Sequence, residues 1–158
     1  MYDKLSAINY ATFWWNKRNP NFYNFDSIGG DCTNFISQCL LAGKIIMNTT
    51  KSNGWYFYSL TNRTPSWTGV EEFFNFSVNN KTDFGPKTKI VTISEVEVGD
   101  IVQLLQKGTR FNHNLIITKI DGVNNLTNIK VTCHTNDALN KPLADYYFKK
   151  IRFLKILN

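Results

Sequence analysis

The sequence predicts an α+β protein in which helices come first and an antiparallel β-sheet follows. Over residues 2–17, and again after Cys32, apolar residues recur at the spacing of amphipathic helices. From Ile90 onward the pattern changes to short apolar runs separated by turn residues, which is typical of strands. At 158 residues the chain is long enough for one complete core, so we expect a single domain, 1–158.

The first predicted helix spans residues 2–17. Arg18-Asn19-Pro20 should end it, because the residue before a proline avoids the helical conformation. An aromatic loop over residues 21–28 then leads to the second helix. The residues expected to face the core from the first helix are Leu5, Ile8, Ala11 and Trp15, with Ala7 and Trp14 beside them.

The second predicted helix begins at Cys32, directly after Gly29-Gly30-Asp31, and ends before Gly43. The first turn of a helix has unpaired N–H groups and the positive end of the helix dipole, and both favour a thiolate. Cys32 is therefore a candidate nucleophile, although a cysteine at a helix start can also be a small buried side chain. We expect the Asp31 carboxylate to cap the helix.

The rest of the chain predicts one more short helix and four strands. Residues 68–71 fit a capping box before a helix that carries Phe73 and Phe74. Aromatic residues of the run from Trp55 to Tyr58, or Trp67, are expected on the floor of a cleft, although core packing is the commoner role for any one such ring. The predicted strands are 101–105, 114–120, 128–133 and 146–156.

Both histidines fall in the strand-rich half. His113 precedes the strand 114–120, and a turn centred near Asn124 would place residues 134–136 opposite it. That window contains polar side chains able to orient an imidazole. A cysteine, a histidine and a polar third group follow the logic of thiol acyl-transfer catalysis. We take His134 as the orienting residue, with Asn136 and Asp137 as alternatives.

The composition argues against several other classes of protein. The chain has 18 Lys plus Arg and 12 Asp plus Glu, but the basic residues form no long run and no nucleic-acid recognition motif accompanies them. The three cysteines match no common zinc spacing, so we expect reduced thiols and no metal or other cofactor. Neither a signal peptide nor a membrane span is evident, so we expect a cytoplasmic protein without a membrane partner.

Five segments together resemble the bacterial putative-amidase family, which is related to papain-like cysteine hydrolases that cut peptidoglycan stem peptides. The most specific is Gly29 to Leu40, GGDCTNFISQCL. The others are Arg18-Asn19-Pro20, the turn and strand from Val98 to Val102, His113 at a strand start, and His134 to Asp137. The resemblance covers almost the whole chain.

This resemblance implies a papain-like fold in which the cysteine helix packs on an antiparallel sheet. It also implies a catalytic triad of Cys32, His113 and a third polar group, for which His134, Asn136 and Asp137 remain rivals. The expected chemistry is acyl transfer through a thioacyl-enzyme on Cys32. The alternative to an enzyme is a binding module that keeps the same cleft.

The acceptor decides between two activities. Water would make the protein a cysteine amidase or peptidase, acting on amide bonds such as those of peptidoglycan stem peptides. An amine would make it an amide-forming acyltransferase of peptide or natural-product biosynthesis, with an amine acceptor or a carrier protein as a partner. We expect the aromatic run to exclude water from the cleft, which favours the amine.

Overall fold

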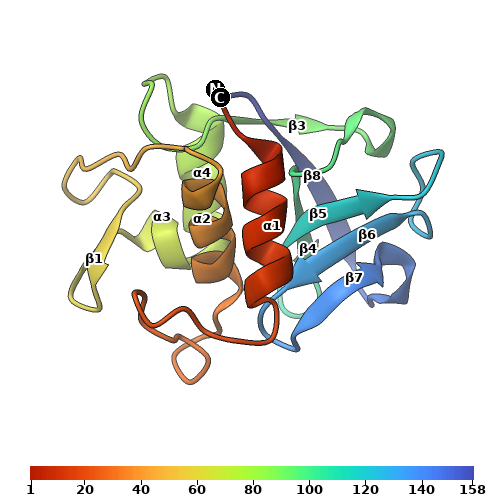
Figure 1. Ribbon diagram of the computed structural model, residues 1–158, viewed down its shortest axis with the longest axis horizontal. Helices are drawn as coiled ribbons and strands as arrows, with labels where there is room; N and C mark the ends of the chain where they lie inside the picture. The colour runs from red at the N-terminus through yellow and green to blue at the C-terminus, as the bar shows by residue number, and fades with distance from the viewer.

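Helices lie on one side of the molecule and a six-stranded antiparallel sheet lies on the other (Figure 1). The structure is a computed structural model that describes residues 1–158, and it confirms the predicted α+β class. The helices are α1 Lys4–Trp14, α2 Cys32–Ala42, α3 Pro65–Thr68 and α4 Val70–Asn79. None of them has the length and apolar character needed to cross a membrane.

The large sheet has the strand order β3-β8-β4-β5-β6-β7. Its strands are β3 Thr88–Val91, β4 Ile101–Leu105, β5 His113–Ile120, β6 Ile129–Cys133, β7 Ala138–Pro142 and β8 Lys150–Ile156. A separate hairpin pairs β1 Phe57–Ser59 with β2 Asn62–Arg63, and short 3-10 helices cover Ile93–Glu95 and Leu143–Asp145. The two ends of the chain meet, since the Tyr2 N–H donates to the carbonyl of Asn158 over 3.1 Å (Figure 1).

Helix α2 is the centre of the larger core, which lies between the helices and the sheet. Every residue from Cys32 to Leu40 is buried, and the apolar members pack with Ile101, Ile116 and Leu154 of the sheet. The expected packing of this helix on the sheet is therefore confirmed. Alternate residues of the same strands, such as Val102 and Leu115, face a second core on the other side of the sheet.

Gly43 ends α2 as predicted, but for another reason than a left-handed conformation. Its φ is −73°, which any residue could adopt. A Cβ at this position would lie 2.4 Å from the Tyr2 ring, so the absence of a side chain is what allows the N-terminus to pack there.

Helix α1 is shorter than predicted and turns a different face to the core. Ala7 and Ala11 are buried against α2, whereas Leu5 is 68% exposed. Small residues let two helices approach closely, so the alanines are at the contact and the larger Leu5 is displaced to the surface. The expected stripe through Leu5 was wrong, although its member Ala11 is buried.

The strand predictions are accurate for β4 and within one residue for β5 and β6. The last strand begins at Lys150 and not at 146, because Leu143–Asp145 form a 3-10 turn that precedes it. Strand β7 was not predicted at all. It is a short edge strand with the sequence ALNKP, and Asn140 has a positive φ of 49°, so it lacks the alternating apolar pattern.

The aromatic residues expected in the cleft are mostly core residues. Trp55 and Trp67 are both fully buried, and their ring centroids lie 4.6 Å apart. Each indole N–H also donates to α2, from Trp55 to Ser37 Oγ and from Trp67 to Asn34 Oδ1. These rings fix the helix from the side opposite the sheet, so the prediction that they form a cleft wall was wrong.

Candidate active site

Cys32 is the first residue of α2 and is almost completely buried. Burial raises the pKa of its thiol, and the charge of Asp31 adds to that effect. The backbone N–H of Asn114 and the neighbouring Thr33 act in the opposite direction without cancelling the rise. The free protein therefore carries a neutral thiol here, and a nucleophilic reaction needs a base to take its proton.

His113 is the first residue of β5 and is 5% exposed. Burial lowers the pKa of its imidazole to about 4, and the positive charge of Lys141 acts in the same direction. The ring is thus neutral near pH 7 and has a lone pair to accept a proton. No hydrogen bond joins it to the Cys32 thiol, whose polar side-chain neighbour is the Thr33 hydroxyl at 3.9 Å.

A hydrogen bond next to these two residues fixes β5 to the start of α2. Asn114 Nδ2 donates to Thr33 Oγ1 over 2.9 Å, and both residues are fully buried. Cys32 and His113 are the chain neighbours of this bonded pair, and the Asn114 N–H acts directly on the Cys32 thiol. This hydrogen bond therefore holds the chain segments that carry the predicted nucleophile and the predicted base against each other.

His134 has other partners than His113. Its Nδ1 lies 2.6 Å from Asp31 Oδ2, its Nε2 lies 2.8 Å from the carbonyl oxygen of Trp14, and its ring stacks on Phe35. The carbonyl of Trp14 can only accept, so Nε2 donates to it, and Nδ1 is bonded to the Asp31 carboxyl group. With both nitrogens engaged, His134 has none left to bind the ring of His113.

Asp31 is the N-cap residue of α2, but its side chain forms no capping hydrogen bond, so the predicted cap by its carboxylate was wrong. Its Oδ1 accepts the backbone N–H of Phe25 and the amide of Asn34, each over 2.9 Å. Its other oxygen bonds His134. The buried carboxylate therefore connects the loop before α2, the helix and the end of β6.

The Asp137 carboxylate likewise binds another residue, Arg18. Its two oxygens accept from Arg18 over 2.9 and 3.1 Å, and the same guanidinium binds Asp26. The nearest Arg18 nitrogen also lies 3.6 Å from Asp31. Asp137 thus connects the turn after β6 to the loop that follows α1, away from the imidazole of His113.

Asn136 is the one rival for the third position that shares a hollow with His113. Its amide forms no hydrogen bond within the protein, and both it and Thr135 have a positive φ, of 59° and 65°. The pairing of Ile116 with Thr132, continued along the two strands, places position 135 opposite His113. The register therefore agrees with the predicted window 134–136. Within that window, Thr135 and Asn136 are the residues that line the hollow of His113.

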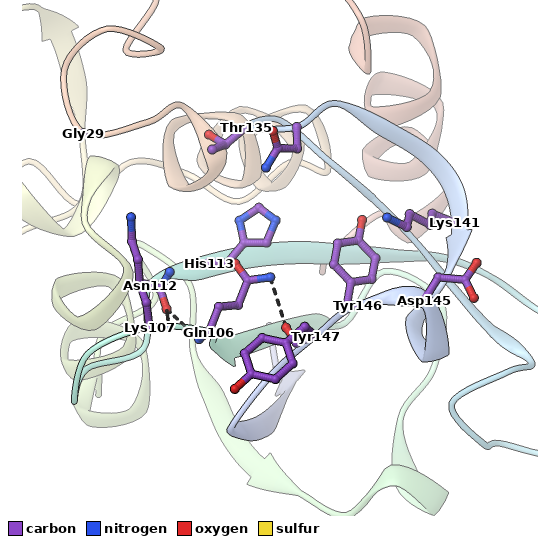
Figure 2. Close-up of a pocket in the computed structure, with 11 residues that line it drawn as sticks. Gly29, Gln106, Lys107, Asn112, His113, Thr135, Lys141, Asp145, Tyr146 and Tyr147 are labelled. Atoms are coloured by element: carbon purple, nitrogen blue, oxygen red, sulfur yellow. Dashed lines mark hydrogen bonds between the residues drawn. The ribbon is translucent and has the colours of Figure 1, made fainter.

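Two adjoining hollows open at this point of the surface, and Figure 2 shows the residues that line the larger one. The larger, of about 440 Å³, is lined by His113, and the smaller, of about 280 Å³, is lined by Cys32. Gly29 and Asn112 line both. A substrate lying across Gly29 and Asn112 would therefore contact the thiol on one side and the imidazole on the other.

Sequence reasoning missed Asn114, Thr33 and Lys141. Asn114 is an amide inside the otherwise apolar start of a strand, directly after His113, and that contrast was a readable signal. Nothing local marks Lys141, because it reaches the site through an unpredicted strand. No three His, Cys, Asp or Glu side chains converge as metal ligands would.

The site thus has a thiol at a helix start and a histidine at a strand start, each lining one of the two adjoining hollows. The chain belongs to the family described as "Putative amidase domain", which matches residues 1–156. The chain is also 35% identical over 123 residues to "Uncharacterized protein YhbB" of Bacillus subtilis (strain 168). That alignment covers 76% of this chain but 38% of the relative. No solved structure matches the chain.

Proposed function

We propose that this protein is a cysteine amidase that cleaves an amide bond through a thioester on Cys32. The observation that supports the proposal is the hydrogen bond between Asn114 and Thr33, which joins the chain neighbours of His113 and Cys32. The family description supports amidase activity in general. The papain-like cysteine mechanism is our own extension of it.

The first half-reaction forms the thioester. His113 takes the proton of the Cys32 thiol while the sulfur attacks the amide carbonyl carbon, giving a tetrahedral oxyanion. Unpaired N–H groups in the first turn of α2 are suited to stabilise this oxyanion. The oxyanion then collapses, the C–N bond breaks, and His113 gives its proton to the leaving nitrogen.

The second half-reaction restores the enzyme. His113 takes a proton from water as its oxygen attacks the thioester carbon, the C–S bond breaks, and the proton returns to the Cys32 sulfur. The products are a carboxylic acid and an amine. A neutral imidazole and a neutral thiol are the correct resting forms for this sequence of proton transfers.

For the third catalytic position we propose Asn136 over His134 and Asp137. The other two side chains are bonded to Asp31 and Arg18, whereas the Asn136 amide is free and lines the same hollow as His113. An amide oxygen can accept from an imidazole N–H and so select its tautomer. Asn136→Ala should therefore lower kcat more than Asp137→Asn does.

Water is the acceptor that we propose. The aromatic residues that motivated amine transfer are mostly core residues, none of them lines the two hollows, and those hollows are lined mainly by polar side chains. Partitioning of an acyl donor between acid and amide at graded concentrations of a small diamine measures the alternative. Amide formed above the rate of the reaction without enzyme would support the acyltransferase reading.

The test of the proposal is a comparison of cysteines. Cys32→Ala should abolish hydrolysis across a panel of N-acyl peptides and amides, with a loss of several orders of magnitude. Cys133→Ala is the matched control, because Cys133 is also buried near the site but bonds Tyr146. Cys32→Ala protein with near-normal turnover would disprove the mechanism.

A further inference from the structure

The hollow beside His113 carries two lysines that no acidic group of the protein neutralises. Lys107 and Lys141 line it, and neither ammonium forms a salt bridge. Asp145 also lines the hollow, but in Figure 2 its carboxylate points away from His113. The lining thus has an excess of positive charge, which a bound anion would balance.

The neighbouring hollow, which contains Cys32, is different. Its acidic residues are Glu71 and Glu72, and each is already paired. Glu72 binds Arg110 over 3.2 Å, and Glu71 binds Arg152 over 2.8 Å. The uncompensated charge of the site is therefore confined to the His113 side.

Lys141 is held in a defined position. It belongs to β7, where it pairs with Val131 of β6, so its backbone is part of the sheet. Its ammonium lies 4.4 Å from the centroid of the Tyr146 ring, at cation–π distance, and Figure 2 draws its side chain extending toward Tyr146. Its positive charge also contributes to the lowered pKa of the His113 imidazole.

The reaction assigns one side of the substrate to each hollow. His113 must reach the leaving nitrogen to protonate it, so the leaving amine lies toward the hollow that His113 lines. Cys32 bonds the acyl carbon, so the acyl group lies toward the other hollow. We infer that the hollow beside His113 binds a carboxylate carried by the leaving amine, with Lys141 as its main contact and Lys107 as the second.

This inference rests on the proposed amidase activity and narrows its substrates. The bond cleaved would join an acyl group to an amine that bears a carboxylate, as in an N-acyl amino acid or a peptide cut before its last residue. A carboxylate at Lys141 would also offset the charge that disfavours protonated His113. Substrate of this kind would thereby make His113 a stronger base in the complex than in the free protein.

A binding experiment tests the inference without turnover. Cys32→Ala protein, with histidine rings labelled for NMR, is titrated with N-acetylglycine and with N-acetylglycinamide at equal ionic strength. We expect N-acetylglycine to shift the His113 signal and raise the pKa of its ring, and the uncharged amide to bind at least about 10-fold more weakly. Equal binding of both probes, or no binding of either, would overturn the inference.

Variants locate the contact. Lys141→Gln should weaken N-acetylglycine binding about 10-fold and leave N-acetylglycinamide unaffected. Lys149→Gln is the matched control, because Lys149 is exposed and does not line the hollow. A preference for the carboxylate that survives in the Lys107→Gln/Lys141→Gln double variant would also overturn the inference.

A kinetic comparison tests whether the hollow binds a carboxylate on the leaving amine or on the acyl group. Active enzyme is given N-acylglycine and N-acylglycinamide, and separately N-succinyl and N-acetyl amides of one uncharged amine. We expect the Lys141-dependent increase in kcat/KM only with the first pair. An increase only with the succinyl group would overturn the assignment to the leaving amine. Loss of turnover in Cys32→Ala is a separate result, so failure of this inference and of the amidase proposal can be told apart.

Discussion

Replacing His134 tests whether that residue supports the fold or orients the catalytic imidazole. The His134 ring and the Asp31 carboxylate are each 1% exposed and lie 2.6 Å apart. Removing one partner of this buried hydrogen bond costs about 1–3 kcal/mol, because the other partner is left buried and unsatisfied. For a domain of this size that corresponds to a Tm lowered by about 2–12 °C in His134→Ala.

Thermal unfolding and turnover are measured on the same preparations. Asp137→Asn is the matched control: it weakens a partly exposed pair with Arg18, so it should cost only about 0–1 kcal/mol. In the double variant Asp31→Asn/His134→Ala the losses should be less than additive, since both changes remove one interaction. A His134→Ala protein with unchanged Tm and a thousand-fold lower kcat would refute this reasoning and make His134 the orienting residue.

Three further predictions follow from the same contacts. Thr33→Val should cost about 1–3 kcal/mol and lower kcat, measured by denaturant unfolding and turnover, because the buried Asn114 amide loses its acceptor. Burial lowers the pKa of His113 to about 4, so the unfolded chain takes up a proton that the folded chain does not as the pH falls below about 6.5. The free energy of unfolding should then decrease by up to about 3 kcal/mol between pH 7 and pH 4, and His113→Gln should remove that part of the slope. Gly43→Ala should lower the Tm, because its Cβ would clash with the Tyr2 ring and cost about 1–3 kcal/mol.

Local patterns in the sequence were enough for the elements that bury an apolar face. The helix from Cys32 and the strand Ile101–Leu105 were predicted closely, since the helix repeats its apolar residues at helical spacing and four of the five strand residues are apolar. Helix α1 was placed on the wrong face because its contact uses alanines, which carry little hydrophobic signal. Strand β7 was missed because an edge strand needs no apolar alternation.

Local sequence patterns were likewise enough for some residues of the candidate site and not for others. Cys32 and His113 could be proposed from their positions at the starts of a helix and a strand. The partners of His134 and Asp137 could not, because Asp31 and Arg18 lie more than 100 residues earlier in the chain. Hairpin register identified the segment 134–137, but positive φ angles at Thr135 and Asn136 decide which side chain faces the hollow of His113.

The sequence also could not tell whether the tryptophans near the aromatic run lie in a cleft or in the core. Trp55 and Trp67 carry polar N–H groups that suited a binding cleft, yet Ser37 and Asn34 of α2 satisfy both within the core. Whether a tryptophan faces a substrate or a helix depends on such distant partners. The expectation of a water-excluding wall was wrong for that reason, and the aromatic run therefore gives no support to an amine acceptor.

The most direct test of the central claim is to trap the acyl-enzyme. The protein is quenched with acid during turnover of N-acyl amino acids, and its intact mass and peptide map are measured. We predict an adduct equal in mass to the acyl group, located on Cys32, present in Cys133→Ala and absent in Cys32→Ala. Turnover with no adduct on Cys32, or with activity that survives its replacement, would contradict the account.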